Sequence, residues 1–197
     1  RCFISEGLAQ QIALKYFYAG PMFRRERPQK GRLRQFHQIG IELIGVAGPA
    51  ADIDVIVAGY RLLSDLGLRE KVTLEMNTLG DPASRKNYRD ALIAYLTPHL
   101  GDLSRESHER FERNPLRILD SKNEGDQKIV ADAPELIDFL TEESRVFFDR
   151  VKEGLERIGV PYQLNPRLVR GLDYYGHTAF EFTTSALGAQ GTVLAGG

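Results

Sequence analysis

The chain has 197 residues, of which 42% are hydrophobic and 27% charged, so it can hold one sizeable core or a core with a smaller appended domain. A formal net charge of −1 provides no global basic field for nucleic acid, and the single cysteine, Cys2, excludes an internal disulfide framework. No apolar run approaches the ~20 residues of a membrane-spanning helix and no signal peptide opens the chain, so a cytoplasmic location and no membrane partner are expected.

The N-terminal quarter is predicted to hold one helix and one hairpin. Ser5 is a suitable N-cap, and apolar residues at four-residue spacing predict a helix that continues to the stop at Gly20-Pro21. Two extended runs, over 22–26 and 35–44, flank a polar loop. This pattern predicts a β-hairpin with a long tip. The chain opens on Arg1 rather than methionine and stops just after a predicted strand, so we expect a piece of a longer protein.

The middle of the chain changes from mixed structure to helices. An apolar face over residues 53–63 predicts a helix that Gly67 ends, and strict alternation over 72–78 predicts a half-buried strand. Pro82 suits the first turn of a helix, and residues 82–159 are rich in charge and helical period without a clear strand. This block is therefore interpreted as a helical insertion.

Strand character returns in the C-terminal part, where β-branched and aromatic residues dominate three short runs over 162–164, 177–182 and 192–195. Strands on both sides of a helical block favour one antiparallel sheet interrupted by an insertion, an α+β arrangement with helices flanking the sheet. The predicted division is a core over 1–79, a helical insertion domain over 80–160 and a return to the core over 161–197.

The densest chemistry lies in residues 23–38. Six cations fall within eleven residues beside one carboxylate, Glu26; they are Arg24, Arg25, Arg27, Lys30, Arg32 and Arg34. A bare charge run is most often a solvated hairpin tip. Here, however, arginine forks suit phosphate, Gly31 permits a close backbone approach, and Phe36 offers an aromatic face to a base. The segment is interpreted as a nucleotide site that is not a P-loop.

Two further groups of polar residues have both a structural and a functional interpretation. Gln38 and Glu42 point to the same face of a predicted strand, where Glu42 could bind a ligand or simply pair with an arginine. The segment 168–178 packs Arg170, Asp173, Tyr174 and Tyr175 between glycines. Taken alone, it fits an ion pair beside two core tyrosines as well as it fits a site.

Residues 23–38 closely resemble motif 2 of class II aminoacyl-tRNA synthetases, in the form found in histidyl-tRNA synthetases. Residues 168–175 resemble the histidine-specific motif of that family, and 187–197 resemble its Leu-Gly-x-Gln-Gly-Thr-Val-x-Ala-Gly-Gly run. Residues 114–122 resemble part of its helical insertion, so the resemblance spans essentially the whole chain. It implies a class II antiparallel sheet flanked by helices, with a helical insertion domain.

The resemblance also implies an activity: ATP-dependent activation of L-histidine to histidyl-adenylate, followed by transfer to tRNA(His). Magnesium would arrive with ATP as substrate, no protein-bound metal is expected, and the full-length protein would be a homodimer. The implied ATP-binding residues are Arg24 at the α-phosphate, Glu26 and Phe36 at the adenine, and Arg32 toward the distal phosphates. The implied histidine-binding residues are Gln38, Glu42, Tyr174 and Tyr175, with Arg170 contacting histidine and serving with Arg24 as a catalytic cation.

The family's motif 1, motif 3, anticodon-binding domain and an N-terminal histidine-contacting loop are not among these residues. The chain is therefore expected to be incompletely competent alone. Gly176-His177 stands where the family often has Asn-Arg, a change expected to be neutral. One alternative is a histidine-sensing regulatory paralogue, although the retention of Arg24, Glu26, Arg32 and Arg170 favours an enzyme. Another is a helical RNA-binding module over 82–159, but that block has no basic excess.

Overall fold

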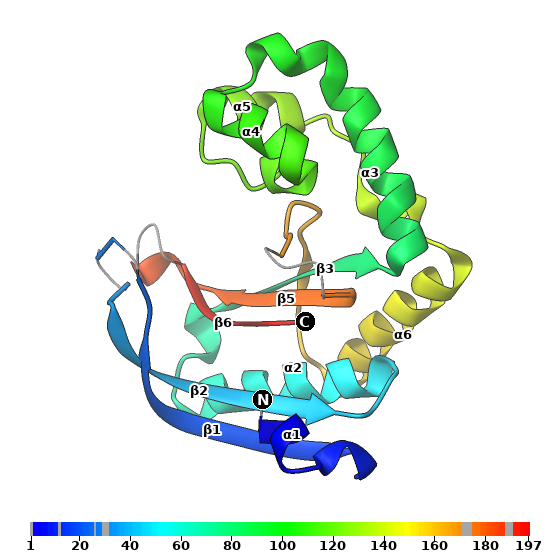
Figure 1. The fold of residues 1–197 in the computed structure, drawn as a ribbon. Helices are drawn as coiled ribbons and strands as arrows, with labels where there is room; N and C mark the ends of the chain where they lie inside the picture. The colour runs from blue at the N-terminus through cyan, green and yellow to red at the C-terminus, as the bar shows by residue number, and fades with distance from the viewer. Residues whose placement is uncertain (1, 12, 26, 29–31, 171–174, 188–190) are drawn as a thin grey trace.

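The computed structural model describes residues 2–11, 13–25, 27–28, 32–170, 175–187 and 191–197. Two of the predicted site residues, Glu26 and Tyr174, lie outside the described residues. A sheet occupies the centre of the molecule, with two long helices on one side and a helical unit on the other (Figure 1). This arrangement confirms the predicted α+β class with a sheet flanked by helices.

The helix predicted from Ser5 to Gly20 is wrong. The chain forms a short helix α1 (Cys2–Ser5), a 3-10 turn (Leu8–Gln10) and then strand β1 (Leu14–Phe23). A four-residue apolar spacing fits the period of two as well as that of 3.6, so it did not discriminate between strand and helix. The aromatic run at 16–18 favours a strand, and the pairing with β2 extends over ten consecutive residues.

The predicted hairpin is confirmed, and its second strand β2 (Gln35–Ile44) has the predicted bounds, but its first strand β1 begins at Leu14, well before the predicted run over 22–26, and ends at Phe23. The two strands pair antiparallel from Leu14 opposite Ile44 to Phe23 opposite Gln35. Among the described residues these two strands form a sheet of their own. The expectation of a single sheet is therefore wrong for the hairpin, because within the described ranges its two strands pair with each other and not with the central sheet.

The central sheet has the order β4-β3-β5-β6, with β3 at Thr73–Gly80, β4 at Gln163–Leu164, β5 at His177–Thr183 and β6 at Thr192–Gly196. The pairs β3–β5 and β5–β6 are antiparallel, and the two-residue pair β3–β4 is parallel. Since β3 precedes the helical block and the other strands follow it, the prediction of a sheet interrupted by an insertion is confirmed here.

Helices α2 (Pro49–Asp65) and α6 (Glu142–Ile158) pack together on one face of the central sheet. Their apolar faces and the sheet form one core, which includes Ile56, Met76, Phe148, Val151 and Phe182. Gly154 allows the close crossing of the two helices, because a side chain there would overlap Ile53 of α2. Both helices follow the apolar faces predicted from the sequence.

A second core lies in the helical unit, which comprises α3 (Pro82–Leu96), α4 (Arg105–Arg113) and α5 (Glu124–Val130) with short 3-10 turns between them. Its fully buried residues include Tyr88, Leu92, Leu96 and Ile118. Among the described residues of this unit there is no strand, as the sequence predicted.

The two chain crossings between the helical unit and the rest of the molecule are joined by reciprocal helix caps. Asp81 caps α3 and Thr141 caps α6, and the Thr141 hydroxyl donates to the Asp81 carboxylate at 2.6 Å. The Asp81 N–H donates to Ser144 Oγ, and the Thr141 N–H donates to Ser84 Oγ. Burial would raise the pKa of Asp81, but hydrogen bonds to its carboxylate, from the Ser84 N–H and the Thr141 hydroxyl among others, lower it well below its usual range.

Candidate active site

One face of the hairpin carries both predicted groups of ligand-binding residues. The Arg24 guanidinium lies over the Phe36 ring, 4.2 Å from its centroid, at the end nearest the hairpin tip. Further along, Gln38 donates to the Tyr18 hydroxyl at 2.7 Å, and Glu42 lies opposite Tyr16 in the register. Residues of even number on β2 share this face, so Phe36 and Glu42 lie about 20 Å apart along the strand.

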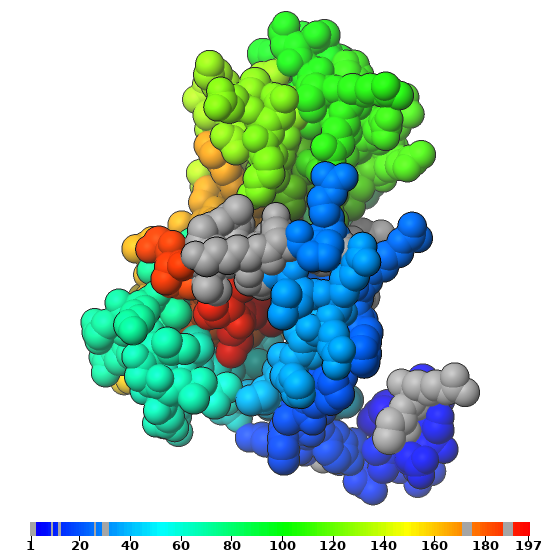
Figure 2. All heavy atoms as spheres, turned by 90° about the vertical axis from the view of Figure 1, so that its left-hand side faces the viewer, coloured from blue at the N-terminus to red at the C-terminus, as the bar shows by residue number. Residues whose placement is uncertain are grey.

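A cavity of about 510 Å³ lies between this hairpin, helix α2 and strands β5 and β6. It is lined by three of the predicted histidine-binding residues, Gln38, Glu42 and Tyr175. Figure 2 shows the hairpin beside the β6 end of the central sheet, with the helical unit above them. Residues far apart in the sequence are therefore brought together at one site.

The described residues of the predicted nucleotide site, Arg24, Arg32 and Phe36, do not line the cavity. Arg24 is exposed at the tip end of the hairpin, and Arg32 and Phe36 are half-buried there. The backbone N–H of Arg24 donates to the Arg34 carbonyl, which continues the register one step beyond the strands. The site thus has two ends along one hairpin face, one arginine-rich and aromatic and the other polar and concave.

The Arg170 side chain bonds to residues of the central sheet and does not line the cavity. Its Nη1 lies 2.6 Å from Glu181 Oε1 in an ion pair, and its Nη2 donates to the Phe180 carbonyl and to the Gly196 carbonyl at 3.0 Å. Its guanidinium lies 5.9 Å from the Tyr175 ring centroid. Because Tyr175, Phe180 and Gly196 all line the cavity, Arg170 is adjacent to the site without lining it.

Sequence reasoning missed several residues of the site. Asp52 brings a second carboxyl to the cavity beside Glu42; burial raises its pKa, although the neighbouring Thr178 hydroxyl and His177 favour the charged form. Among the described lining residues there is no Lys, Arg or His, so the cavity suits a ligand that supplies N–H donors. Tyr18 was missed because its segment was assigned to a helix.

Two other polar residues bond to groups next to the cavity, one to a backbone carbonyl and one to a side chain. The Arg85 guanidinium of α3 donates to the Tyr175 carbonyl, and Glu181 holds Arg170. Glu181 had a detectable signal in the sequence, because a carboxylate in a short apolar strand needs a partner when it is buried.

None of the helices in the described ranges combines the length and the apolar composition that a membrane span requires. In the same ranges, no group of three His, Cys, Asp or Glu side chains could hold a metal ion.

Comparisons with known proteins identify the family of this chain. A family model described as histidyl-tRNA synthetase matches residues 3–197. The histidine–tRNA ligase of Rhodospirillum rubrum is 63% identical over 197 residues, which are 100% of this chain and 48% of that protein. The chain thus spans about half the length of the curated relatives it matches.

Two solved structures support the assignment at different levels. Apo histidyl-tRNA synthetase of S. aureus has a TM-score of 0.70 at 36% identity, covering 92% of this chain and 41% of that one. A Bacillus halodurans protein described as an ATP phosphoribosyltransferase regulatory subunit/histidyl-tRNA synthetase has a TM-score of 0.57 at 20% identity, covering 95% and 52%, which shows a common fold alone. The match to the family model and the identity to the ligases show that the chain belongs to the histidyl-tRNA synthetase family.

Proposed function

We propose that the chain is the central part of a histidine–tRNA ligase, which uses MgATP to convert L-histidine to histidyl-adenylate and then transfers the histidyl group to tRNA(His). The observation that carries this proposal is the two-ended hairpin face. It has a cation and an aromatic ring at one end, Arg24 over Phe36, and two polar side chains at a cavity at the other, Gln38 and Glu42.

The two ends fit the two substrates. Phe36 would stack on adenine while Arg24 and Arg32 contact the phosphates, Arg24 at the α-phosphate. Glu26, outside the described residues, would contact the adenine. Glu42 and Tyr175 would satisfy the two nitrogens of neutral imidazole, one a donor and one an acceptor. Gln38 and Tyr174 would complete the pocket, which would reject analogues that lack a nitrogen by ~10⁴-fold.

Formation of histidyl-adenylate requires positioning of the substrates and stabilisation of charge, and it does not require a general base. The carboxylate of histidine is already ionised at neutral pH, and it attacks the α-phosphorus in line with departing pyrophosphate. Arg170 and Arg24 would stabilise the negative charge that develops on the α-phosphoryl oxygens. Arg170 would also contact the bound histidine, consistent with its place beside Tyr175.

The remaining properties follow the family. We propose that the full-length protein is a cytoplasmic homodimer that binds L-histidine, MgATP and tRNA(His), and that the segments outside this chain contribute to full activity. The alternative is a histidine-sensing regulatory protein of the same fold. Arg24, Arg32 and Arg170 are all retained in this chain, whereas a protein that only senses histidine does not need to contact ATP.

Histidine-dependent ATP–pyrophosphate exchange by the full-length parent protein tests this proposal. We expect exchange in the parent and a loss of about 100-fold or more in kcat for Arg170→Ala. Arg167→Ala is the matched control, because Arg167 is an exposed arginine in the same segment and is expected to leave exchange within threefold. A folded parent that binds histidine but shows no exchange would establish the regulatory alternative instead.

A further inference from the structure

We infer that Glu181 is a positioning residue that sets the orientation of Arg170 for the activation step; the inference rests on the proposed function of Arg170. The Arg170 and Glu181 side chains are 12% and 21% exposed, and Nη1 lies 2.6 Å from Oε1. A charge pair this close and this buried is strongly directional, because each charge has little water to replace its partner.

The carboxylate of Glu181 is itself fixed by a neighbouring strand. Its second oxygen, Oε2, accepts from the Thr192 hydroxyl of β6 at 2.7 Å. The carboxylate therefore bridges a residue of the histidine-specific segment and a residue of β6. With both oxygens engaged, Glu181 cannot rotate without breaking one of these contacts.

The guanidinium is constrained on a second side by the backbone. Its Nη2 donates to the carbonyls of Phe180 and Gly196, which belong to β5 and β6. Three of the five N–H donors of Arg170 are thus used, and its buried Nε has no hydrogen-bond partner among the described residues. Glu181 and the two carbonyls set the plane of the group and leave one Nη1–H for an acceptor such as a phosphoryl oxygen.

A neighbouring carboxylate shows that this role is specific to Glu181. Glu75 of β3 lies directly opposite Glu181 in the sheet register, and both line a second cavity of about 510 Å³ beneath the helical unit. Glu75, however, accepts from Asn165 at 2.5 Å and from Thr183 at 3.1 Å. It is a matched residue on the same face whose described partners do not include Arg170.

The test compares Glu181→Gln with Glu75→Gln in the full-length parent, using steady-state ATP–pyrophosphate exchange. For Glu181→Gln we expect kcat to fall about 10- to 100-fold and the KM for histidine to rise by a smaller factor, because Arg170 is misplaced while the other histidine contacts remain. Glu75→Gln is expected to keep kcat within threefold. Equal losses in both variants, or a loss confined to KM, would overturn the inference.

A double-mutant cycle separates positioning from general stabilisation. If Glu181 acts only through Arg170, adding Glu181→Gln to Arg170→Ala lowers kcat no further, whereas a multiplicative loss would contradict the inference. Glu181→Asp, which restores the charge, is expected to recover part of kcat.

A third readout does not depend on activity. In the side-chain NMR spectrum of selectively labelled arginine, the Nη1 and Nη2 signals of Arg170 should be separate in the parent and merge in Glu181→Gln, as rotation about the Cζ–Nη bonds becomes faster. Unchanged signals would overturn the inference. An inactive wild-type parent would overturn the proposed function instead, and the NMR comparison would still decide whether Glu181 fixes the guanidinium.

Discussion

The polar end of the hairpin depends on a residue that has no side chain. Gly40 lies opposite Tyr18 in the register, and the Tyr18 ring lies across the Gly40 backbone so closely that a Cβ there would overlap the ring. This position of the ring brings the Tyr18 hydroxyl to Gln38. Gly40 therefore fixes Gln38 indirectly, by letting Tyr18 lie flat on the strand.

We predict that Gly40→Ala in the parent protein raises the KM for histidine about tenfold with little change in kcat, because Tyr18 must move and Gln38 loses its partner. The measurement is ATP–pyrophosphate exchange at varied histidine. Gly20→Ala is the control, since Gly20 lies in the same hairpin with open space around it. Equal KM values for the two variants would contradict the role given to Gly40.

At the residue scale, the sequence identified which residues belong to the candidate site better than it identified which residues contact one another. Gln38, Glu42 and Tyr175 were predicted from motifs and do meet at one cavity. Asp52 was not predicted, because a single acidic residue early in an amphipathic helix is ordinary sequence, and only the packing of α2 against β5 turns it toward the cavity. Contacts between distant segments are set by packing, which no local pattern encodes.

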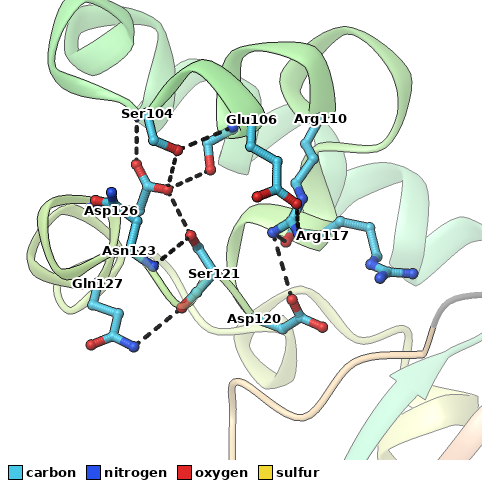
Figure 3. A network of polar contacts seen from close by, with 10 residues as sticks. Ser104, Glu106, Arg110, Arg117, Asp120, Ser121, Asn123, Asp126 and Gln127 are labelled. Atoms are coloured by element: carbon cyan, nitrogen blue, oxygen red, sulfur yellow. Dashed lines mark hydrogen bonds and ion pairs between the residues drawn. The ribbon is translucent and has the colours of Figure 1, made fainter. Parts of the chain in front are cut away.

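At the scale of elements, a single buried carboxylate organises the helical unit. Asp126 of α5 is fully buried, and its Oδ2 accepts from the hydroxyls of Ser104, Ser107 and Ser121 at 2.6–2.7 Å, while Oδ1 accepts from the Ser104 N–H (Figure 3). Burial would raise the pKa of Asp126, but the hydrogen bonds outweigh burial and lower the pKa to about 2. The carboxylate thereby connects α5 to the N-cap of α4.

The low pKa has a defined consequence for stability. Because the pKa of Asp126 is lower in the folded state than its ordinary value of 3.8, the charged form adds stability above about pH 4. That contribution is lost as the pH falls from about 4 through about 2. Below this range the protonated carboxyl can no longer accept all three hydroxyls.

We predict that Asp126→Asn lowers the free energy of unfolding at pH 7 by about 2–3 kcal/mol, because an amide NH₂ then faces three hydroxyl donors. It should also weaken the loss of stability between pH 4 and pH 2. Urea unfolding followed across that range measures both effects. Asp132→Asn, at an exposed position of the same unit, is the control and should change stability by less than about 0.5 kcal/mol.

Most elements could be predicted from the sequence, and the failure has an identifiable cause. α2, β3 and α6 have long, consistent apolar faces with glycine or proline at their ends, and the structure confirms them. β1 was mistaken for a helix because four-residue spacing is ambiguous and its pairing partner lies about twenty residues away. Pairing with β2, together with the strand propensity of the aromatic run at 16–18, decided that segment.

At the scale of the whole molecule, the two cores divide the chain differently from the predicted ranges. The core of the helical unit lies in α3 to α5 and the turns around them, whereas Phe148, Val151 and Leu155 of α6 belong to the core shared with α2 and the sheet. We propose that the insertion runs from Asp81 to Thr141, the two residues joined by the reciprocal caps, rather than to residue 160.

Two alanine variants of buried residues test this division. Leu92→Ala in α3 and Phe148→Ala in α6 each remove a side chain that is at most 2% exposed, at a cost of roughly 2–5 kcal/mol. We predict that Leu92→Ala accelerates amide hydrogen exchange in α3, α4 and α5 while β3 and β5 stay protected. Phe148→Ala should accelerate exchange in α2, β3 and β5, because its cavity opens in the other core.

The two boundaries make opposite predictions for Phe148→Ala. If the insertion ended near residue 160, α6 would belong to it, and Phe148→Ala would increase exchange in α3 to α5 and spare β3.

Histidine binding by the same two variants tests which of the two cores supports the cavity. Leu92→Ala should leave the affinity for histidine unchanged, since the cavity that we propose for histidine is lined by α2, β5, β6 and the hairpin. Phe148→Ala should weaken binding by loosening the sheet from which Thr178 and Phe180 line the cavity.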